Sequence, residues 1–288
     1  MNDPRLHHVL CIDPNGLHRM AYWEWGASDN PRVVVCVHGL TRQGRDFDTL
    51  ARALSSEFRV ICPDVVGRGQ SDWLKDPLGY QVPTYVADMV TLVARLNVEQ
   101  VSWVGTSMGG LIGMGLASLA GSPITKLVLN DVGPVIEPVA IARIATYVGV
   151  PQHWSSVDDA ADALWRISES FGPHSREQWL ALTRPQLKAA PQGGWMPHYD
   201  PGLALPVRAM TPELVRLGDA LLWRAYDAIR CPTLLIRGAE SDLLSPATAE
   251  AMTSRGPKAL RVDLPGVGHA PTLVADDQVQ LVVDFLRS

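Results

Sequence analysis

The sequence predicts an α/β protein, with a mostly parallel sheet that carries helices on both faces and is interrupted by an inserted helical cap. Short β-branched runs such as residues 33–37 alternate with stretches of helical periodicity, a pattern typical of parallel strands covered on both faces. The alternation stops at Gly133-Pro134, gives way to helical sequence, and resumes near residue 231. At 288 residues the chain is long enough for one large core with an insertion.

The part before the interruption opens with an antiparallel hairpin and continues with strands and helices in turn. Asp13-Pro14-Asn15-Gly16 places strong turn-forming residues between two extended stretches. Farther along, Pro83-Thr84 suits a helix start, and apolar residues follow it at helical spacing. We expect strands at 8–13, 18–25, 33–37, 59–64, 101–104 and 124–131, and helices at about 46–56, 82–96 and 110–120.

The interrupting segment has helical patterns and few strand signals. Its clearest helices are 157–171, 176–189 with a break at Pro185, and 211–229. Strands at 232–237 and 260–264 and an amphipathic helix at about 276–286 follow it. We therefore expect a core made of residues 1–133 and 231–288, and a cap made of residues 134–230.

Composition indicates which binding partners and which cellular location to expect. The net charge of -5 and the pI near 5.9 provide no basic surface for nucleic acid or an anionic membrane. The first residues lack the apolar segment of a secretory signal, and no apolar run approaches the roughly 18 residues of a membrane span. The cysteines lack C-x-x-C spacing and lie in or beside predicted strands, which favours buried free thiols over disulfides or a zinc site. We expect a cytoplasmic protein without a metal, and the sequence indicates no oligomeric state.

The segment Gly105-Thr106-Ser107-Met108-Gly109 fits a glycine-x-serine-x-glycine turn. A buried strand is predicted before it and a helix of small residues after it. A serine at such a turn sits on a sharp bend with its hydroxyl exposed, and the flanking glycines leave room for the bend. The pattern is short enough to occur by chance, so its place between a strand and a helix carries the prediction that Ser107 is a nucleophile.

A serine nucleophile needs a base, usually a histidine that is oriented by a carboxylate. His269 lies in a glycine-bracketed loop after the last predicted strand, where sheets of this kind place working residues. We expect His269 to be the base and Asp242, just after the strand that follows the insertion, to be the acid. Asp131, at the end of the strand before the insertion, is the alternative, because the chain order serine, acid, histidine permits either.

Taken together, these motifs resemble the α/β-hydrolase family with a helical cap, over nearly the whole chain. His38-Gly39, the loop from Asp64 to Ser71, the serine turn, and the loops that carry Asp242 and His269 occur in the family's order. The resemblance implies an oxyanion hole made by the backbone N–H groups of Leu40 and Met108, with His38 holding its loop. It also implies acyl transfer to water through an acyl-enzyme, with no metal or organic cofactor.

The substrate implied by this resemblance is a small carboxylic ester or a lactone. Ser107 at the turn argues against a dehalogenase or an epoxide hydrolase, which would have an aspartate there. Hydrolases that cleave carbon-carbon bonds in ring-fission products share the Ser-Met-Gly-Gly sequence, but many have an aromatic residue after the catalytic histidine, where this chain has Ala270. A non-catalytic small-molecule-binding protein that has kept the scaffold is a third interpretation, since fold does not establish function.

Two further residues are candidates for substrate binding. Arg42, two residues beyond Leu40, could bind a substrate carboxylate or could instead pair with Asp46 or a cap carboxylate. Trp195 lies in an irregular stretch and could line an apolar pocket. The other tryptophans of the cap are expected to pack it onto the core.

Overall fold

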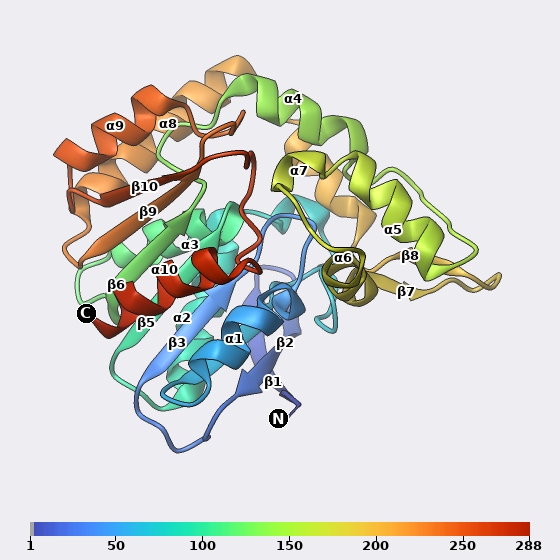
Figure 1. Ribbon diagram of the computed structural model, residues 1–288, viewed down its shortest axis with the longest axis horizontal. Coiled ribbons are helices and arrows are strands. Elements are labelled where there is room, and N and C mark those ends of the chain that lie inside the picture. The colour runs from blue at the N-terminus through green and yellow to red at the C-terminus, as the bar shows by residue number, and fades with distance from the viewer. Residues whose placement is uncertain (1–2) are drawn as a thin grey trace.

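The sheet has eight strands, and the computed structural model describes residues 3–288. The strands are β1 (Arg5–Asp13), β2 (Gly16–Trp25), β3 (Val33–Val37), β4 (Arg59–Asp64), β5 (Val101–Thr106), β6 (Ile124–Asn130), β9 (Thr233–Gly238) and β10 (Leu260–Leu264). Their order across the sheet is β1-β2-β4-β3-β5-β6-β9-β10 (Figure 1). β2 pairs antiparallel with β1 and β4, and the other neighbouring pairs are parallel. The predicted mostly parallel sheet is confirmed.

Helices cover both faces of this sheet. α1 (Asp48–Leu54) and α10 (Asp276–Arg287) pack on one face, and α2 (Val82–Leu96), α3 (Met108–Ala117) and α9 (Pro246–Ser254) pack on the other. The side chains of Val33, Val35 and Val37 belong to the apolar cluster under α2 and α3, whereas Val34 and Cys36 belong to the cluster under α1 and α10. Since alternate side chains of a strand point to opposite faces, a strand that is apolar throughout needs cover on both sides.

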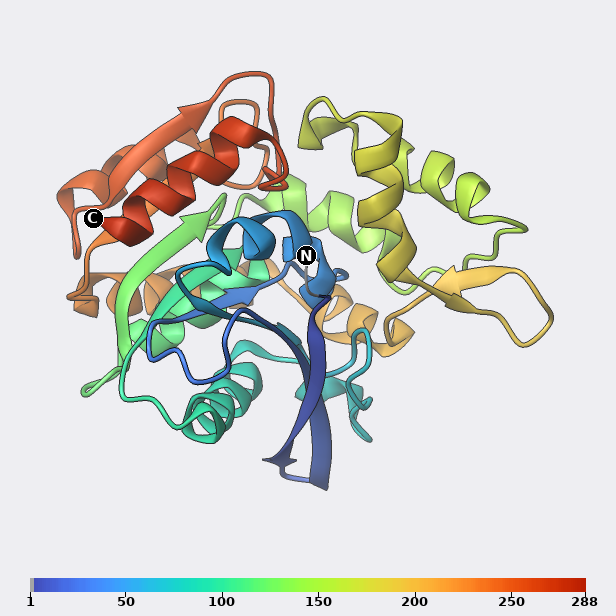
Figure 2. The same cartoon turned by 60° about the horizontal axis from the view of Figure 1, so that its bottom comes forward.

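The segment between β6 and β9 leaves the sheet and rises over one edge of it (Figures 1 and 2). It contains α4 (Pro138–Tyr147), α5 (Val157–Arg166), α6 (Arg176–Thr183), β7 (Leu187–Ala189), β8 (Trp195–Pro197), α7 (Ala204–Arg208) and α8 (Pro212–Ala228). The insertion therefore interrupts the chain between two neighbouring strands of one sheet. Because β6 and β9 are parallel, the insertion begins at the carboxyl end of β6 and returns to the opposite end of the sheet, where β9 begins.

The insertion differs in several places from the predicted helical segment with few strand signals. The helix expected at 176–189 ends at Thr183 and continues only as a 3-10 turn that contains Pro185, after which β7 and β8 form a hairpin that projects outward (Figure 2). The helix expected at 157–171 ends at Arg166 and is followed by a separate 3-10 turn at Glu169–Phe171. The sequence did not predict α4 and α7 in the insertion, or α9 in the core. α8 packs against α3, and its Tyr226 is fully buried in the core, so this helix belongs by packing to the core although it lies within residues 134–230.

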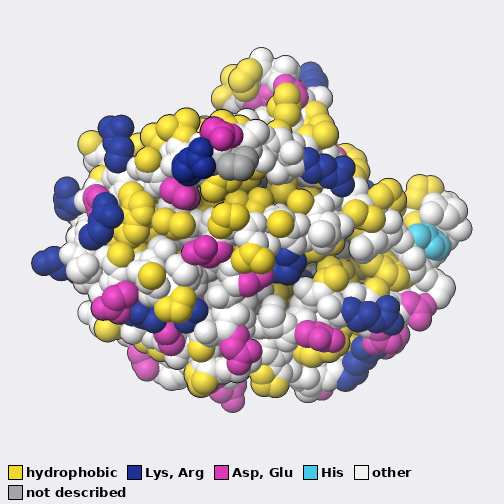
Figure 3. All heavy atoms as spheres, turned by 90° about the horizontal axis from the view of Figure 1, so that it is seen from above, with side chains coloured by type: hydrophobic (Ala, Val, Ile, Leu, Met, Phe, Trp, Pro, Cys, Tyr) yellow, Lys and Arg dark blue, Asp and Glu magenta, His cyan; other side chains and the backbone are white. Residues whose placement is uncertain are grey.

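The surface seen from above carries apolar side chains with basic and acidic ones interspersed among them (Figure 3). Charges of both signs alternate over this face, as expected for a chain with a net charge of only -5. Among residues 3–288, no helix combines the length and the apolar character needed to span a bilayer.

Candidate active site

Ser107 lies between the end of β5 and the start of α3, on the bend that the sequence predicts. Its backbone has φ 52° and ψ -117°, a strained conformation for a residue with a side chain. A Cβ atom on Gly109 would collide with the carbonyl group of Val37, and one on Gly105 would collide with the backbone of Gly109. The two glycines are therefore required because strand β3, strand β5 and helix α3 meet at this bend.

His269 follows β10 and reaches Ser107 from the neighbouring loop. Its Nε2 atom lies 2.9 Å from the Ser107 Oγ, a hydrogen-bonding distance for a base and the hydroxyl that it activates. The backbone N–H of Gly268 donates to the carbonyl oxygen of Ser170 in the insertion, which anchors this loop. The structure thus brings together the two residues that the sequence predicts as nucleophile and base.

Asp131 provides the carboxylate beside His269. Its Oδ2 atom lies 2.7 Å from the His269 Nδ1, and its side chain is fully buried. The backbone N–H of Gly238 donates to Oδ1 at 2.8 Å, and the Ser241 hydroxyl donates to Oδ2 at 2.6 Å. With both oxygens bonded by groups from β9 and its loop, the carboxylate is held as an acceptor that faces the imidazole.

Asp242, the acid favoured from the sequence, does not occupy this position. It forms a two-point ion pair with Arg143 of α4, with 2.6 Å from Nε to Oδ2 and 2.9 Å from Nη2 to Oδ1. Partial burial works to raise the pKa of Asp242, but the hydrogen bonds and the charge of Arg143 lower that pKa below its usual range. The expectation that Asp242 orients His269 is wrong in this geometry, and the alternative, Asp131, takes its place.

The physical reason for the difference lies in the pairing of two strands. β6 and β9 are parallel neighbours, so the loops after both strands open at the same edge, close to His269. After β9, Ser241 points back to Asp131, and the next residue turns toward the insertion. The sequence pattern does not show which of the two aspartates contacts His269. The ion-pair partner of Asp242 is Arg143, which lies 99 residues earlier in α4, a helix that the sequence did not predict.

The two predicted oxyanion donors flank the nucleophile. Met108 is the first residue of α3, where a backbone N–H has no partner within its helix, and Leu40 lies in the loop after β3. Within the described chain neither N–H donates to another backbone group. Next to this loop, the Nδ1–H of His38 donates to the Gly39 carbonyl, and its Nε2 accepts from the Val65 N–H. Burial lowers the pKa of His38 to about 3, so a neutral ring holds the loop.

A cavity opens above Ser107, between the core and the insertion. It contains about 1200 Å³ of empty space, mouth included. Residues that the sequence reasoning did not single out line its walls: Arg143, Tyr147, Trp154, Phe171 and Tyr199. Trp195, predicted to line an apolar pocket, does not line this cavity and instead pairs its backbone with Trp154. The tryptophan at the cavity is therefore Trp154, which forms an isolated backbone bridge with the candidate Trp195. This pairing joins segments 41 residues apart and is seen only in the tertiary structure.

Arg42 does line the cavity, and it also forms the ion pair that the sequence offers as its alternative role. Its Nε lies 2.5 Å from the Asp46 Oδ2, and its Nη2 lies 2.9 Å from Oδ1. The Gln186 amide of the insertion donates to the same carboxylate at 2.7 Å. Arg42 and Asp46 therefore form part of the joint between the core and the insertion.

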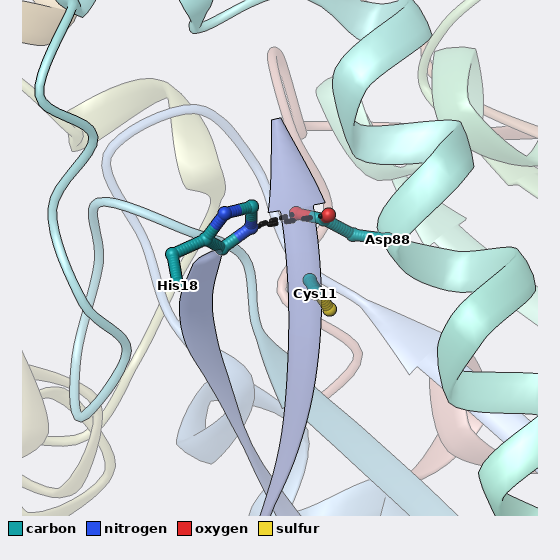
Figure 4. A group of neighbouring side chains, drawn as sticks. All are labelled: Cys11, His18 and Asp88. Atoms are coloured by element: carbon teal, nitrogen blue, oxygen red, sulfur yellow. Dashed lines mark hydrogen bonds and ion pairs between the residues drawn. The ribbon is translucent and has the colours of Figure 1, made fainter. Parts of the chain in front are cut away.

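One group of potential metal ligands lies elsewhere in residues 3–288. The donor atoms of Cys11, His18 and Asp88 lie within 4.8 Å of one another, and the His18 ring of β2 faces Asp88 of α2 (Figure 4). Both ring nitrogens already face carboxylates, with 3.0 Å from Nε2 to Asp88 and 3.2 Å from Nδ1 to Asp13. Burial, with the charge of Asp88, raises the pKa of the Cys11 thiol to about 12, whereas a metal would need a thiolate. The group is a buried hydrogen-bonded link between the hairpin and α2.

Comparison with known proteins identifies the family to which this fold belongs. The model of the alpha/beta hydrolase fold family matches residues 32–276. A 3-hydroxybutyrate-oligomer hydrolase from Cupriavidus necator is 55% identical over 286 residues, which cover 98% of this chain and 97% of that protein. The esterase YbfF of Escherichia coli is 26% identical over 251 residues, 83% of this chain and 87% of the other.

Solved structures place the same fold over the whole length. An alpha/beta hydrolase from Novosphingobium aromaticivorans is 34% identical with a TM-score of 0.87, and the match covers 100% of this chain and 99% of the other. This match includes the insertion as well as the sheet. The family model and the relatives that match nearly the whole chain lead to one conclusion: the chain belongs to the alpha/beta hydrolase fold family.

Proposed function

We propose that this hydrolase cleaves carboxylic esters through an acyl-enzyme, and that its substrates are short oligoesters of a small hydroxy acid. The observation that carries the first half is the hydrogen-bonded series Ser107, His269, Asp131, with 2.9 Å and 2.7 Å between successive partners. The second half is supported by the 55% identity to a 3-hydroxybutyrate-oligomer hydrolase over nearly all of both chains.

In the proposed reaction, the Ser107 Oγ attacks the ester carbonyl while His269 Nε2 takes its proton. The imidazolium that forms is stabilised by the buried Asp131 carboxylate, which also fixes the tautomer that leaves Nε2 free to accept the proton. The alkoxy C–O bond then breaks, and His269 returns the proton to the leaving alcohol. His269 then takes a proton from a water molecule as the water oxygen attacks the acyl carbon. The bond from that carbon to the Ser107 Oγ breaks, His269 returns the proton to Oγ, and the acid is released.

The backbone N–H groups of Leu40 and Met108 are proposed to bind the carbonyl oxygen as it becomes negative. Losing one such donor typically costs about 3 kcal/mol in the transition state. Because the donors are backbone groups, their side chains can change without removing them. No step needs a metal or an organic cofactor.

The composition of the cavity suits a small, mildly polar ester. Its walls combine apolar side chains from the insertion, such as Ile144 and Phe171, with the side chains of Tyr147 and Tyr199, which each carry a hydroxyl. An oligoester of a hydroxy acid has the same character, because methyl-bearing carbons alternate with ester groups along its chain. Lactones share the reacting carbonyl and belong in the same assay.

The proposal is tested with a fluorophosphonate probe and a substrate panel on the purified protein. We expect the probe to label Ser107, and the protein to cleave p-nitrophenyl butyrate and a linear 3-hydroxybutyrate trimer. Ser107→Ala should lose labelling and at least about 10⁴-fold in kcat. Labelling at another residue would refute the nucleophile. Turnover of a ring-fission dienone with none of the esters would refute ester hydrolysis, and binding without any turnover would favour a non-catalytic role.

A further inference from the structure

Two arginines reach the cavity, one from the core and one from the insertion. Arg42 extends from the loop after β3, and Arg143 from α4. Each guanidinium forms a two-point ion pair with an aspartate through Nε and Nη2. In each pair the aspartate occupies the edge of the guanidinium that carries Nε and Nη2, so an incoming carboxylate can bind that edge only after the aspartate is released.

The two aspartates differ in how readily they can be released. Asp46 also accepts from Gln186, its side chain is only 15% exposed, and desolvation raises its pKa. Released from Arg42, it would be left as a poorly hydrated charge, which is costly. The Asp242 side chain is 35% exposed, and among the described residues its side-chain partner is Arg143 alone, so water can replace that partner.

A second donor stands beside Arg143. Tyr147 lies one turn farther along α4, on the same side of the helix, and lines the same cavity. A tyrosine hydroxyl is protonated near neutral pH, and burial raises the pKa of Tyr147 further although the charge and hydrogen bond of Arg143 oppose this, so the hydroxyl can donate. The Arg143 guanidinium and the Tyr147 hydroxyl, which lie on the same wall of the cavity, together could bind an anion.

We propose that Arg143 binds the free carboxylate at the acid end of the oligoester, displacing Asp242, and so determines which ester bond is cut. This inference rests on the proposed oligoester activity. In such an oligomer the free carboxylate belongs to the fragment released as the alcohol. Arg143 therefore serves the leaving-group side of Ser107, and the acyl group on the serine comes from the hydroxyl-terminal fragment.

The chemical step is unchanged by this assignment. Ser107 Oγ forms a bond to the ester carbonyl carbon, the bond from that carbon to the alkoxy oxygen breaks, and His269 protonates the leaving oxygen. The product is a hydroxy acid whose carboxylate is still held by Arg143. It leaves as Asp242 pairs again with the guanidinium.

The test uses a matched pair of esters, 3-(butyryloxy)butanoate and its neutral carboxamide, with p-nitrophenyl butyrate as a reference substrate. Wild-type protein should prefer the carboxylate by about 10- to 100-fold in kcat/KM, the range of a charge-assisted hydrogen bond. Arg143→Ala and Arg143→Gln should lose this preference through a higher KM for the carboxylate, with the carboxamide nearly unaffected. Asp242→Asn should keep or raise the preference, because it removes the competing carboxylate.

Arg42→Ala is the matched control, and it should lower turnover of both esters equally. The inference is overturned if Arg143→Ala lowers both esters equally, which would mean that the residue only joins the insertion to the core. It is also overturned if the preference is lost in Arg42→Ala instead. If wild type cleaves p-nitrophenyl butyrate but neither matched ester, the oligoester function falls and this inference with it. If wild type cleaves both equally, only the inference falls.

Discussion

The loops after β6 and β9 open side by side, and each carries an aspartate within reach of the site, yet the two aspartates have different environments. Asp131 is fully buried and accepts from Gly238, Ser241 and the His269 ring. Asp242 is about one-third exposed and pairs with Arg143 of the insertion. The comparison shows that a carboxylate's partners, more than its position along the chain, determine what it can do.

The two environments suit different tasks. A buried carboxylate whose oxygens are held by fixed donors keeps one orientation while the charge on His269 changes, which is what a catalytic acid needs. A partly exposed carboxylate whose side chain has a single ion-pair partner can exchange that partner for water at little cost. The edge formed by β6 and β9 thus carries one rigid and one exchangeable carboxylate.

The strongest test of this difference between Asp131 and Asp242 is to replace each aspartate in turn with asparagine. Asp131→Asn should lower kcat for p-nitrophenyl butyrate by about 10³- to 10⁴-fold, because an amide that donates to Nδ1 stabilises the wrong imidazole tautomer. Asp242→Asn should stay within about fivefold of wild type, as expected for loss of an exposed ion pair. Steady-state kinetics of both variants, with their folding checked by circular dichroism, would decide.

The reverse ranking, a large loss in Asp242→Asn and a small one in Asp131→Asn, would assign the acid to Asp242 as the sequence first suggested. Equal, partial losses would mean that both carboxylates orient His269. Either result would refute the division between a rigid and an exchangeable carboxylate.

A smaller effect is expected at Ser241, which links the two loops. Ser241→Ala removes the 2.6 Å hydrogen bond to Asp131 and should lower kcat about three- to tenfold, because the carboxylate loses one of its fixed donors. Ser245→Ala is the matched control, since Ser245 caps α9 by accepting from the Thr248 N–H. Ser245→Ala should lower the free energy of unfolding by about 1 kcal/mol and leave kcat unchanged. A loss of kcat in the control but not in Ser241→Ala would contradict the proposed link.

The smallest expected effect concerns the stability contributed by Asp242. Because Arg143 lowers the pKa of this carboxyl on folding, the pair stabilises the protein above the ordinary carboxyl pKa of about 4, and the contribution is lost as the pH falls through the lower folded value. At neutral pH, Asp242→Asn should cost at most about 1 kcal/mol, since the pair is partly exposed and screened by salt.

Denaturant unfolding of wild type and Asp242→Asn across this pH range measures the contribution. The two curves should converge as the pH falls, and added salt should reduce the difference at neutral pH. A difference that grows on acidification would have the wrong sign for a carboxyl whose pKa is lowered in the folded state.

Much of the core could be predicted because its signals are local. The β3 run is apolar at every position, which indicates a strand buried on both faces, and the glycines around Ser107 indicate a bend that excludes a Cβ. The insertion was predicted less well. β7 and β8 have three residues each, too short for periodicity to reveal. They pair with each other, and β8 also makes an isolated backbone bridge to Trp154, 41 residues earlier in the chain.

The sequence by itself determined the alternation of strands and helices, the bend at Ser107 and the place of His269, because each depends on residues close together in the chain. Only the tertiary structure decided between Asp131 and Asp242, and between Trp154 and Trp195. Those choices depend on which groups meet across the β6–β9 edge and across the joint with the insertion. A hydrogen bond spanning 138 residues, such as that from His269 to Asp131, leaves no mark on the local pattern at either end.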